Sequence, residues 1–334
     1  MRFSHLITTV DMHTEGEPTR VIVSGIPTLH GRNIAEKRDY FIENFDRIRR
    51  ALILEPRGHR DMFGAILQPS TREDCEFGVI FIDSGGSVDM CIHATIGVVT
   101  ALVNIGLVQR KEPITEVKLD TCAGPVTARA RVEGDIVKEV TVLNVPSFLV
   151  HSNLEIDIPD VGTVPVDIAF GGNFYAIVNA RDLGLKVEPQ YADKISRLGV
   201  LIRDIVNSKI RVEHPLNKHI NTVKLTRIVD EPKDPRATSR NAVVFGPGQI
   251  DRSPCGTGTC AEMAMRYSKG LLDIGEEIIC ESIIGTRFKG RAVAETKVGD
   301  FRAIIPEVTG RAFITGFHNF VIDEEDPLKE GFLL

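Results

Sequence analysis

Two cysteines that each precede an expected helix constrain this chain more than any other feature. Cys91 is followed by an apolar stretch that ends at Gly106, and Cys255 is followed by a stretch of the same length that ends at Gly270. Glycine is the common residue just past the C-terminus of a helix. The repeat therefore predicts two halves of similar fold, each with one cysteine at the start of a helix.

The bulk composition excludes several classes of protein. The 334 residues are enough for two domains with separate cores, and 43% hydrophobic and 26% charged residues are ordinary values for a globular protein. A net charge of −6 gives no reason to expect a nucleic-acid partner. The sequence has neither the apolar run of a signal peptide nor the roughly eighteen apolar residues of a membrane span. We expect a cytoplasmic protein whose partners include no nucleic acid and no membrane.

The order of expected strands and helices is also repeated. Strands are expected at residues 3–10, 19–23, 62–67 and 77–82 with a helix at 34–54 before Cys91, and at 164–178, 221–229 and 242–245 with a helix at 190–208 before Cys255. The helix after Cys91 is apolar on nearly every side, so protein must surround it, and a curved sheet is the simplest surround. We expect two α/β domains, residues 1–148 plus 310–334 and residues 149–309.

A thiol at a helix start can act as a base. The helix dipole lowers the thiol pKa from its ordinary value of roughly 8.5. The unpaired backbone N–H groups of the first helical turn bind anions such as a substrate carboxylate. These groups belong to Ile92, His93, Gly256 and Thr257. Two thiols facing one carbon could remove a proton from one side and return a proton to the other. The pattern thus predicts an amino-acid racemase or epimerase that needs no cofactor and no metal.

The other cysteines fit a structural role better than a chemical one. Cys75, Cys122, Cys260 and Cys280 are expected to be buried packing residues. A disulfide framework is unusual in a large chain without a secretion signal. A zinc site built on Cys91, His93, Cys255 and Cys260 is disfavoured, since neither spacing is a usual zinc clip.

Four motifs carry a resemblance to a known family: Asp251-Arg252-Ser253-Pro254-Cys255-Gly256-Thr257-Gly258-Thr259, Met90-Cys91-x-His93, residues 11–19 and residues 58–64. The chain resembles the proline racemase family over essentially its whole length. The resemblance implies a fold like that of diaminopimelate epimerase. That fold has two pseudo-symmetric halves, each a barrel-like sheet around a central helix, with the active site in the cleft between them. It also implies a two-base mechanism without pyridoxal phosphate, and a homodimer.

The resemblance assigns roles to individual residues. Cys91 and Cys255 would exchange the roles of base and acid with the direction of reaction. Asp251 would bind the substrate amino group. Phe63 and Phe245 would wall the ring pocket. The carboxylate would be held mainly by backbone N–H groups of Ile92, His93, Gly256 and Thr257.

Branches of the family differ in substrate. The branch that dehydrates 3-hydroxyproline carries threonine in place of the first cysteine, so Cys91 disfavours that activity. Epimerases of 4-hydroxyproline tend to have a histidine near Leu225, and the apolar Leu225 and Val21 here suit an unsubstituted ring. We expect a proline racemase, with a 4-hydroxyproline epimerase or a broader enzyme as the alternative. One departure is Ile92, which stands where the family usually has glycine and which bears on substrate preference.

Two remoter functions remain open. A cysteine hydrolase would use Cys255 as nucleophile with a histidine base, which leaves Cys91 and the repeat unexplained. A non-enzymatic protein that binds proline-like ligands would need the pocket but neither thiol. Serine substitutions separate the three: a racemase needs both cysteines, a hydrolase one, and a binding protein neither.

Overall fold

The computed structural model describes residues 3–334, which form two compact units. The first comprises residues up to 89 together with 93–140 and 311–334, and the second comprises residues 90–92 and 141–310. The strand β8 (Ile136–Leu143) spans the point at which the chain passes from the first unit to the second.

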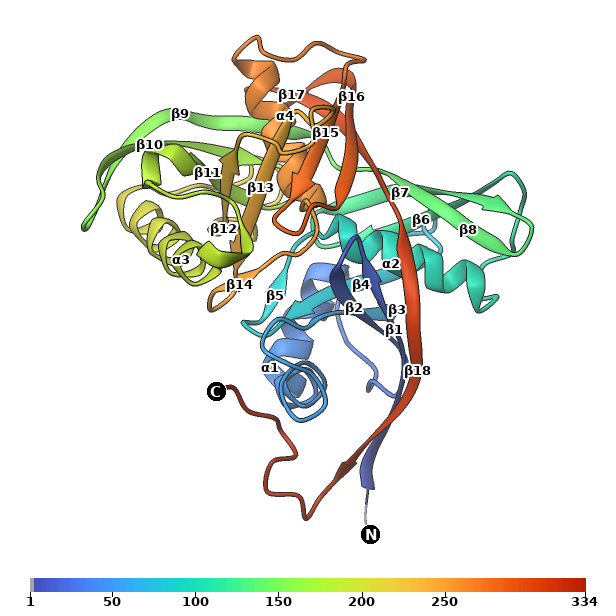
Figure 1. The fold of residues 1–334 in the computed structure, drawn as a ribbon. Helices are drawn as coiled ribbons and strands as arrows, with labels where there is room; N and C mark the ends of the chain where they lie inside the picture. The colour runs from blue at the N-terminus through green and yellow to red at the C-terminus, as the bar shows by residue number, and fades with distance from the viewer. Residues whose placement is uncertain (1–2) are drawn as a thin grey trace. The chain divides into compact units, whose positions relative to one another are not determined.

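The first unit is a sheet that holds one helix on its inner face and another on its outer face (Figure 1). The pairings run in the order β18-β1-β2-β3-β4-β6-β7, with β5 forming a hairpin on β4. Its elements are β1 (Phe3–Thr14), β2 (Glu17–Ser24), α1 (Ile34–Ile53), β3 (Phe63–Gln68), β4 (Phe77–Asp83), β5 (Ser87–Val88), α2 (Ile92–Asn104), β6 (Ile114–Thr121), β7 (Gly124–Glu133) and β18 (Ala312–Asp323).

The helix α2 is buried from Ile92 to Val103, as its lack of a polar face predicts. Close packing against β1 fixes its position. A Cβ on Gly97 would lie 2.9 Å from Sδ of Met12, and Oγ1 of Thr14 donates a hydrogen bond of 2.8 Å to the carbonyl of His93. The sheet therefore holds the start of α2, directly after Cys91, in a defined place.

The helix α1 covers the opposite face of this sheet. Its apolar side chains, among them Ile48 and Leu52, share one core cluster with Ile22 of β2 and Ile66 of β3. The Asn33 side chain caps its N-terminus by accepting a hydrogen bond from the backbone N–H of Glu36. Residues of β2 and β3 that face α1 thus alternate with residues that face α2.

The second unit contains a closed barrel of eight strands. Neighbouring strands pair in the order β9-β10-β11-β12-β13-β15-β16-β17, and pairing of Ala303 on β17 with Phe148 on β9 closes the ring. The strands are β9 (Ser147–Ile158), β10 (Gly162–Phe170), β11 (Phe174–Asn179), β12 (Val223–Asp230), β13 (Ser239–Phe245), β14 (Gln249–Ile250, a hairpin on β13), β15 (Glu277–Ser282), β16 (Arg287–Val298) and β17 (Phe301–Gly310).

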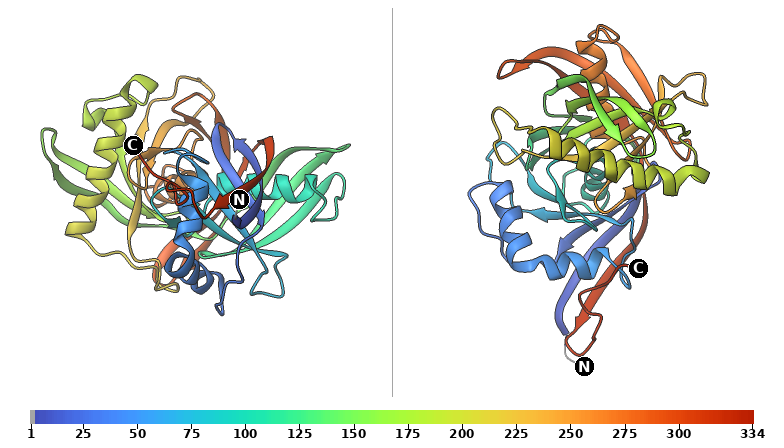
Figure 2. Two further views of the ribbon diagram at one scale, coloured as in Figure 1. Left: turned by 90° about the horizontal axis from the view of Figure 1, so that it is seen from below. Right: turned by 90° about the vertical axis from the view of Figure 1, so that its left-hand side faces the viewer.

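Two helices of this unit repeat the arrangement of the first. The helix α4 (Gly256–Ser268) contacts β9, β10, β11, β16 and β17 and so occupies the barrel, whereas α3 (Ala192–Lys209) lies along β12 and β13 (Figure 2). Short 3₁₀ turns at Ala180–Leu183 and Pro189–Tyr191 lead into α3. The second unit is therefore also a sheet with one helix inside and one outside.

The two units have the same topology. In the first, β1–β2 and β3–β4 pair antiparallel, whereas β2–β3 and β4–β6 pair parallel. In the second, β10–β11 and β12–β13 pair antiparallel, whereas β11–β12 and β13–β15 pair parallel. A two-residue strand, β5 or β14, precedes each cysteine, and each central helix has 13 residues. The expected fold class, two pseudo-symmetric α/β halves with central helices, is confirmed.

Candidate active site

Cys255 occupies a tight turn that directly precedes α4. Its φ of 58° lies in the left-handed region, where a residue other than glycine is strained by about 1–3 kcal/mol. Oδ1 of Asp251 accepts from the backbone N–H of Ser253 at 2.8 Å, and Oγ of Ser253 accepts from the backbone N–H of Cys255 at 3.1 Å. These two hydrogen bonds hold the turn in the strained conformation and fix the direction of the thiol.

The start of α4 provides donors beside this thiol. The first helical hydrogen bond runs from the N–H of Thr259 to the carbonyl of Cys255, at 2.8 Å. The preceding amides, those of Gly256, Thr257 and Gly258, have no carbonyl four residues earlier within the helix and belong to its anion-binding end. The expected carboxylate-binding position at Gly256 and Thr257 is thus a helix N-terminus.

Two side chains that the sequence did not single out adjoin Cys255. The hydroxyl of Tyr175 on β11 lies 3.4 Å from Sγ of Cys255 and 2.5 Å from Oγ1 of Thr257. Nη1 of Arg227 on β12 donates to the carbonyl of Pro254 at 3.1 Å. Both side chains are fully buried. Tyr175 and Arg227 therefore form part of the surroundings of the thiol.

The electrostatics of Cys255 correct one expectation. Burial, together with the negative charge of Asp251, raises the pKa of Cys255 to about 12, although Arg227, Tyr175 and the N–H of Gly258 lower it. The helix start was expected to bring this pKa down toward neutrality, but in the structure without substrate the burial of Cys255 outweighs that effect. Burial also raises the pKa of Asp251 to about 6.

Cys91 lies in a three-residue segment whose contacts are with the second unit. Nδ2 of Asn173, in the turn between β10 and β11, donates to the carbonyl of Met90 at 2.7 Å. Asp89, which directly precedes Met90, belongs instead to the first unit. There Nη1 of Arg38 donates to the Asp89 carboxylate at 2.6 Å. Cys91 and Cys255 therefore both belong to the second compact unit, although α2 belongs to the first.

Ile92 packs directly against the start of the other central helix. A Cβ added to Gly256 would lie 2.4 Å from Cβ and 2.5 Å from Cγ2 of Ile92. Such a distance is far below van der Waals contact, so the absence of a side chain at Gly256 is required. Two residues expected to bind the carboxylate, Ile92 and Gly256, thus adjoin each other.

His93 and Phe63 adjoin each other in the first unit. Their rings meet edge to face with centroids 4.7 Å apart. Burial lowers the pKa of His93 to about 3, so the imidazole is neutral at physiological pH. A neutral buried ring suits the expected role of His93 through its backbone rather than as a proton carrier.

Phe245 and Leu225 are both buried in the second unit. Leu225 pairs in parallel register with Tyr175, so it lies beside the tyrosine that contacts Cys255. Phe245 is the last residue of β13 and immediately precedes the turn to β14. The structure brings Leu225 to the vicinity of Cys255, whereas the role of Phe245 as a ring wall stays a prediction.

The remaining cysteines, Cys75, Cys122, Cys260 and Cys280, are all buried. Burial raises the pKa values of Cys75, Cys260 and Cys280. Protonated, enclosed thiols of this kind behave as small apolar side chains.

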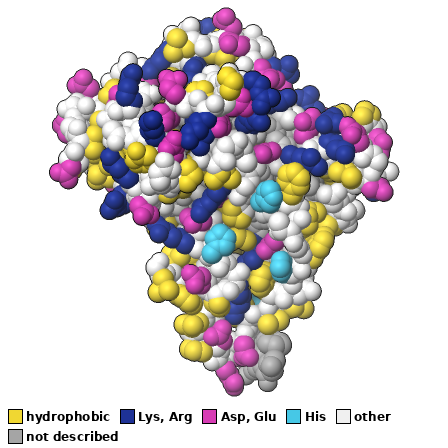
Figure 3. Space-filling model, in the orientation of Figure 1, with side chains coloured by type: hydrophobic (Ala, Val, Ile, Leu, Met, Phe, Trp, Pro, Cys, Tyr) yellow, Lys and Arg dark blue, Asp and Glu magenta, His cyan; other side chains and the backbone are white. Residues whose placement is uncertain are grey.

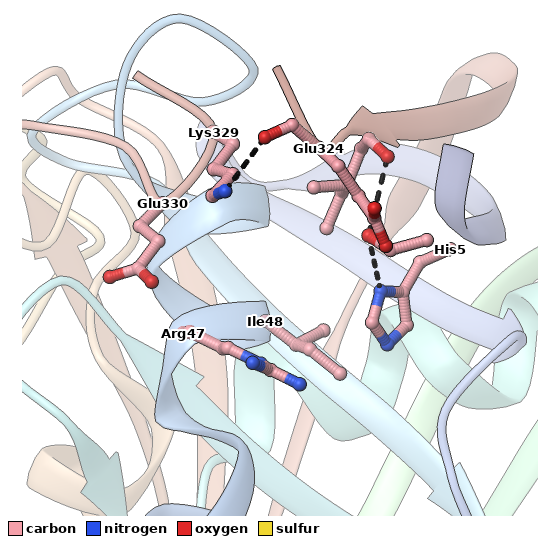
Figure 4. A pocket seen from close by; sticks show the side chains of 8 residues that line it. His5, Arg47, Ile48, Glu324, Lys329 and Glu330 are labelled. Carbon is pink, nitrogen blue, oxygen red and sulfur yellow. Dashed lines mark hydrogen bonds between the residues drawn. The ribbon is translucent and has the colours of Figure 1, made fainter. Parts of the chain in front are cut away.

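A surface pocket in the first unit contains none of these residues (Figure 4). It is lined by Ser4, His5, Arg47, Ile48, Ile322, Glu324, Lys329 and Glu330. Nζ of Lys329 donates to the backbone carbonyl of Glu324 at 2.8 Å across one side of it. We do not include this pocket in the candidate active site, since it holds neither of the two cysteine motifs.

The exterior gives no sign of a polyanion-binding surface on the face drawn in Figure 3, where the described lysine and arginine side chains lie among aspartate and glutamate. None of the helices within residues 3–334 combines the length and the apolar character that a membrane crossing needs.

Comparison with known proteins decides the family. The family model described as proline racemase matches residues 9–333. The chain belongs to the proline racemase family. It is 52% identical to the proline racemase of Clostridioides difficile over 334 residues, which cover 100% of both chains. It is 44% identical to the 4-hydroxyproline 2-epimerase of Streptosporangium roseum, again over 100% of both chains.

A solved structure supports the same family assignment. The hydroxyproline epimerase of Agrobacterium vitis, with bound trans-4-hydroxy-L-proline, matches with a TM-score of 0.95 at 33% sequence identity. The match covers 100% of this chain and 97% of the other. Membership of the proline racemase family, expected from the cysteine motifs, is thereby confirmed.

Proposed function

We propose that this protein is a cofactor-independent racemase that interconverts L- and D-proline. The observation that carries the proposal is the pair of cysteines, Cys91 and Cys255. Each directly precedes a central helix of 13 residues, and both lie within one compact unit. The 52% identity to a proline racemase over the full length supports proline as the substrate.

The reaction needs one thiolate and one thiol. The thiolate of one cysteine takes the α-proton, the electron pair remains on the α-carbon and its carboxylate, and the thiol of the other cysteine delivers a proton to the opposite face. The products are the mirror-image amino acid and an enzyme in which the two cysteines have exchanged protonation states. In the reverse direction Cys91 and Cys255 exchange roles.

The other site residues would hold the substrate. Asp251 would pair with the ring ammonium. The positive charge of the ammonium would also offset the negative charge of Asp251 that opposes ionisation of Cys255. The amides at Ile92, His93, Gly256 and Thr257 would bind the carboxylate and stabilise the charge that develops there, at about 3–4 kcal/mol per well-aimed donor. Phe63, Phe245 and Leu225 would enclose the ring.

The test is proton NMR of L-proline with the enzyme in D2O, combined with polarimetry of the same sample. Loss of the α-proton signal together with loss of optical rotation supports the two-base reaction. Exchange without inversion, or no exchange, contradicts it. The same experiment with trans-4-hydroxy-L-proline tests the alternative substrate, for which the identity to a 4-hydroxyproline 2-epimerase is the supporting observation.

Assembly and location remain predictions. Leu6 on β1 and Val321 and Phe317 on β18 are exposed on one face of the β1–β18 pair, with relative exposures of 62%, 37% and 67%. Apolar residues grouped in this way suit a contact between two copies, so we propose that a homodimer forms through this face. Light scattering of Phe317→Ser tests it, because an unchanged dimer mass would place the interface elsewhere. A cytoplasmic location is likewise expected and untested.

A further inference from the structure

Arg227 and Tyr175 enclose Cys255 from the barrel wall. A Cβ on Gly258 would lie 2.9 Å from Nη1 of Arg227 and 3.1 Å from Sγ of Cys255, so the guanidinium and the thiol flank the same point. The same position is 3.3 Å from Cε1 of Tyr175. Three functional groups from β11, β12 and the turn before α4 thus converge on one glycine.

Arg227 is held rigidly and stays charged. Its Nε and Nη2 donate to Oε2 of Glu262 at 3.1 and 2.6 Å, and Ser239 donates to the same oxygen at 3.1 Å. Arg266 donates to Oε1 of Glu262 at 2.8 Å. Although burial raises it, the two guanidinium groups lower the pKa of Glu262 to about 2. Two cations therefore face one anion in this cluster, which leaves net positive charge behind Cys255.

Arg227 also supports the backbone on which the thiol is mounted. Its remaining donor, Nη1, binds the carbonyl of Pro254, the residue just before the strained Cys255. The guanidinium therefore links the backbone at Cys255 to Glu262, which lies seven residues further along the chain in α4. Removing it would act on both the position and the charge environment of the thiol.

The corresponding positions of the first unit lack these groups. Glu262 is seven residues after Cys255, and the residue seven after Cys91 is Val98. Gly64 and Ile66 of β3 face α1, so Phe63, Ala65 and Leu67 form the other face of that strand, and all three are apolar. The matching face of β2 carries Glu17, Thr19 and Val21, with neither arginine nor tyrosine. The symmetry of the fold is thus not a symmetry of charge.

We propose that Tyr175 and the Arg227–Glu262 pair are positioning residues that ease the ionisation of Cys255 more than that of Cys91. Tyr175 also interacts electrostatically with Cys91, so its effect on the two thiols differs in degree. This inference rests on the proposed function, since it assigns different surroundings to the two thiols of that mechanism. The ionisable groups that face Cys255 are Asp251, which opposes the thiolate, and Arg227 and Tyr175, which favour it. A hydroxyl donor and a guanidinium each stabilise an anionic sulfur at short range.

Two variants test the proposal, each with a matched control. Tyr175→Phe removes only the hydroxyl, and its control is Tyr40→Phe in the first unit. Arg227→Met combined with Glu262→Met removes the pair without leaving a lone buried charge. Its control is Arg240→Met with Glu281→Met, a second buried ion pair of the same unit, 2.6 Å apart, on β13 and β15.

The measurement is the rate of iodoacetamide alkylation of each cysteine against pH, resolved by peptide mass spectrometry. Below the pKa of a thiol, the rate is proportional to the fraction of thiolate, and the control variants report any change in access. We expect both test variants to slow alkylation of Cys255 by about tenfold between about pH 7 and pH 10, as a rise of about one unit in the thiol pKa would. Alkylation of Cys91 should slow less, and the controls should change neither rate.

An unchanged rate of Cys255 alkylation in Tyr175→Phe, or an equal slowing at both cysteines, would overturn the proposal. Should the double methionine variant not fold, as near-ultraviolet circular dichroism would show, Tyr175→Phe alone decides. Alkylation requires no turnover, so a protein without racemase activity would refute the proposed function and still give a readable result here. Racemisation direction cannot serve instead, because enantiomers have equal free energy and kcat/KM must fall equally in both directions.

Discussion

Ile92 and Gly256 meet so closely that a single added methyl group at Gly256 would coincide with the Ile92 side chain, at 2.4 Å from its Cβ. Each residue directly follows one of the two cysteines. The bare backbone of Gly256 accommodates the branched side chain of Ile92. A side chain at Gly256 is therefore expected to be tolerated only when the side chain of Ile92 is made smaller.

Gly256→Ala should cost more than half of the racemase activity and lower the free energy of unfolding by about 1–3 kcal/mol, because overpacking forces side chains off their rotamers. In an Ile92→Gly background the same substitution should cost much less, since the methyl group gains room. Urea denaturation and kcat of the two single variants and the double variant measure this coupling. Strict additivity of the two substitutions would show that the contact is unimportant.

Ile92→Gly on its own should broaden substrate use. The change empties space beside the amide of Gly256, where the carboxylate is proposed to bind, and lets a ring with a hydroxyl substituent shift within the pocket. We expect the ratio of kcat/KM for trans-4-hydroxy-L-proline over L-proline to rise by about tenfold, a size typical of small steric changes in a pocket. Ile92→Val is the matched control and should keep the ratio near that of the parent enzyme.

Much of this fold follows from local sequence patterns, and what was missed has a physical cause. The apolar helix after Cys91 predicts its own burial, and the glycines near residues 16 and 172 mark the two corresponding turns. The sequence patterns did not predict the barrel strands β9, β15, β16 and β17. On β9 and β16 polar residues alternate with apolar ones over only part of the strand, and closure of the barrel depends on pairings between residues more than 150 positions apart, which no local pattern encodes.

The site was partly predictable for a similar reason. Cys91, Cys255 and Asp251 lie in short motifs whose chemistry is local. Tyr175 and Arg227 reach Cys255 through strand register from positions 80 and 28 residues earlier in the chain. One signal was present, because an arginine in the middle of a strand, between Thr226 and Ile228, needs a partner if it is buried.

Serine in place of either cysteine should abolish racemisation. The serine hydroxyl does not ionise near neutral pH, and general acid–base groups contribute about 10²–10⁴-fold to rate. Both Cys91→Ser and Cys255→Ser should therefore lose at least about a hundredfold in kcat, measured by polarimetry with L-proline and with D-proline. Cys260→Ser, at a buried thiol outside the mechanism, is the control for loss of folding. Racemisation retained in either single variant would contradict the two-thiol mechanism.

The acid limb of the pH profile should report Asp251. Its pKa is raised to about 6 by burial, so the carboxyl is protonated, and cannot pair with the substrate ammonium, below that pH. We expect kcat/KM to fall as the pH drops through about 6, mainly through a rise in KM. Asp251→Asn should remove this limb along with most of the activity. It should also lower the pH midpoint for alkylation of Cys255, because the charge of Asp251 raises the pKa of that thiol. An unchanged midpoint would show that the charge of Asp251 has no effect on the ionisation of Cys255.

Activity should depend on thiols and on no added cofactor. Dialysis against EDTA should leave kcat unchanged, as should hydroxylamine, which captures pyridoxal phosphate. Iodoacetamide should inactivate the enzyme, and pyrrole-2-carboxylate should protect it, because its planar ring carbon resembles the flattened carbanion. Loss of activity with EDTA or hydroxylamine, and restoration by metal or by pyridoxal phosphate, would replace the two-thiol scheme.

The repeated topology has a consequence for proton transfer at the two faces of the substrate. In a symmetric dimer of identical halves, every substitution beside one thiol would also appear beside the other, so both would share one proton affinity. One chain that contains both halves is free of that constraint. Val98 and Glu262 each lie seven residues after the cysteine of their half, and only Glu262 is charged. The surroundings of each thiol can therefore be adjusted separately to the face of the substrate from which that thiol removes the proton.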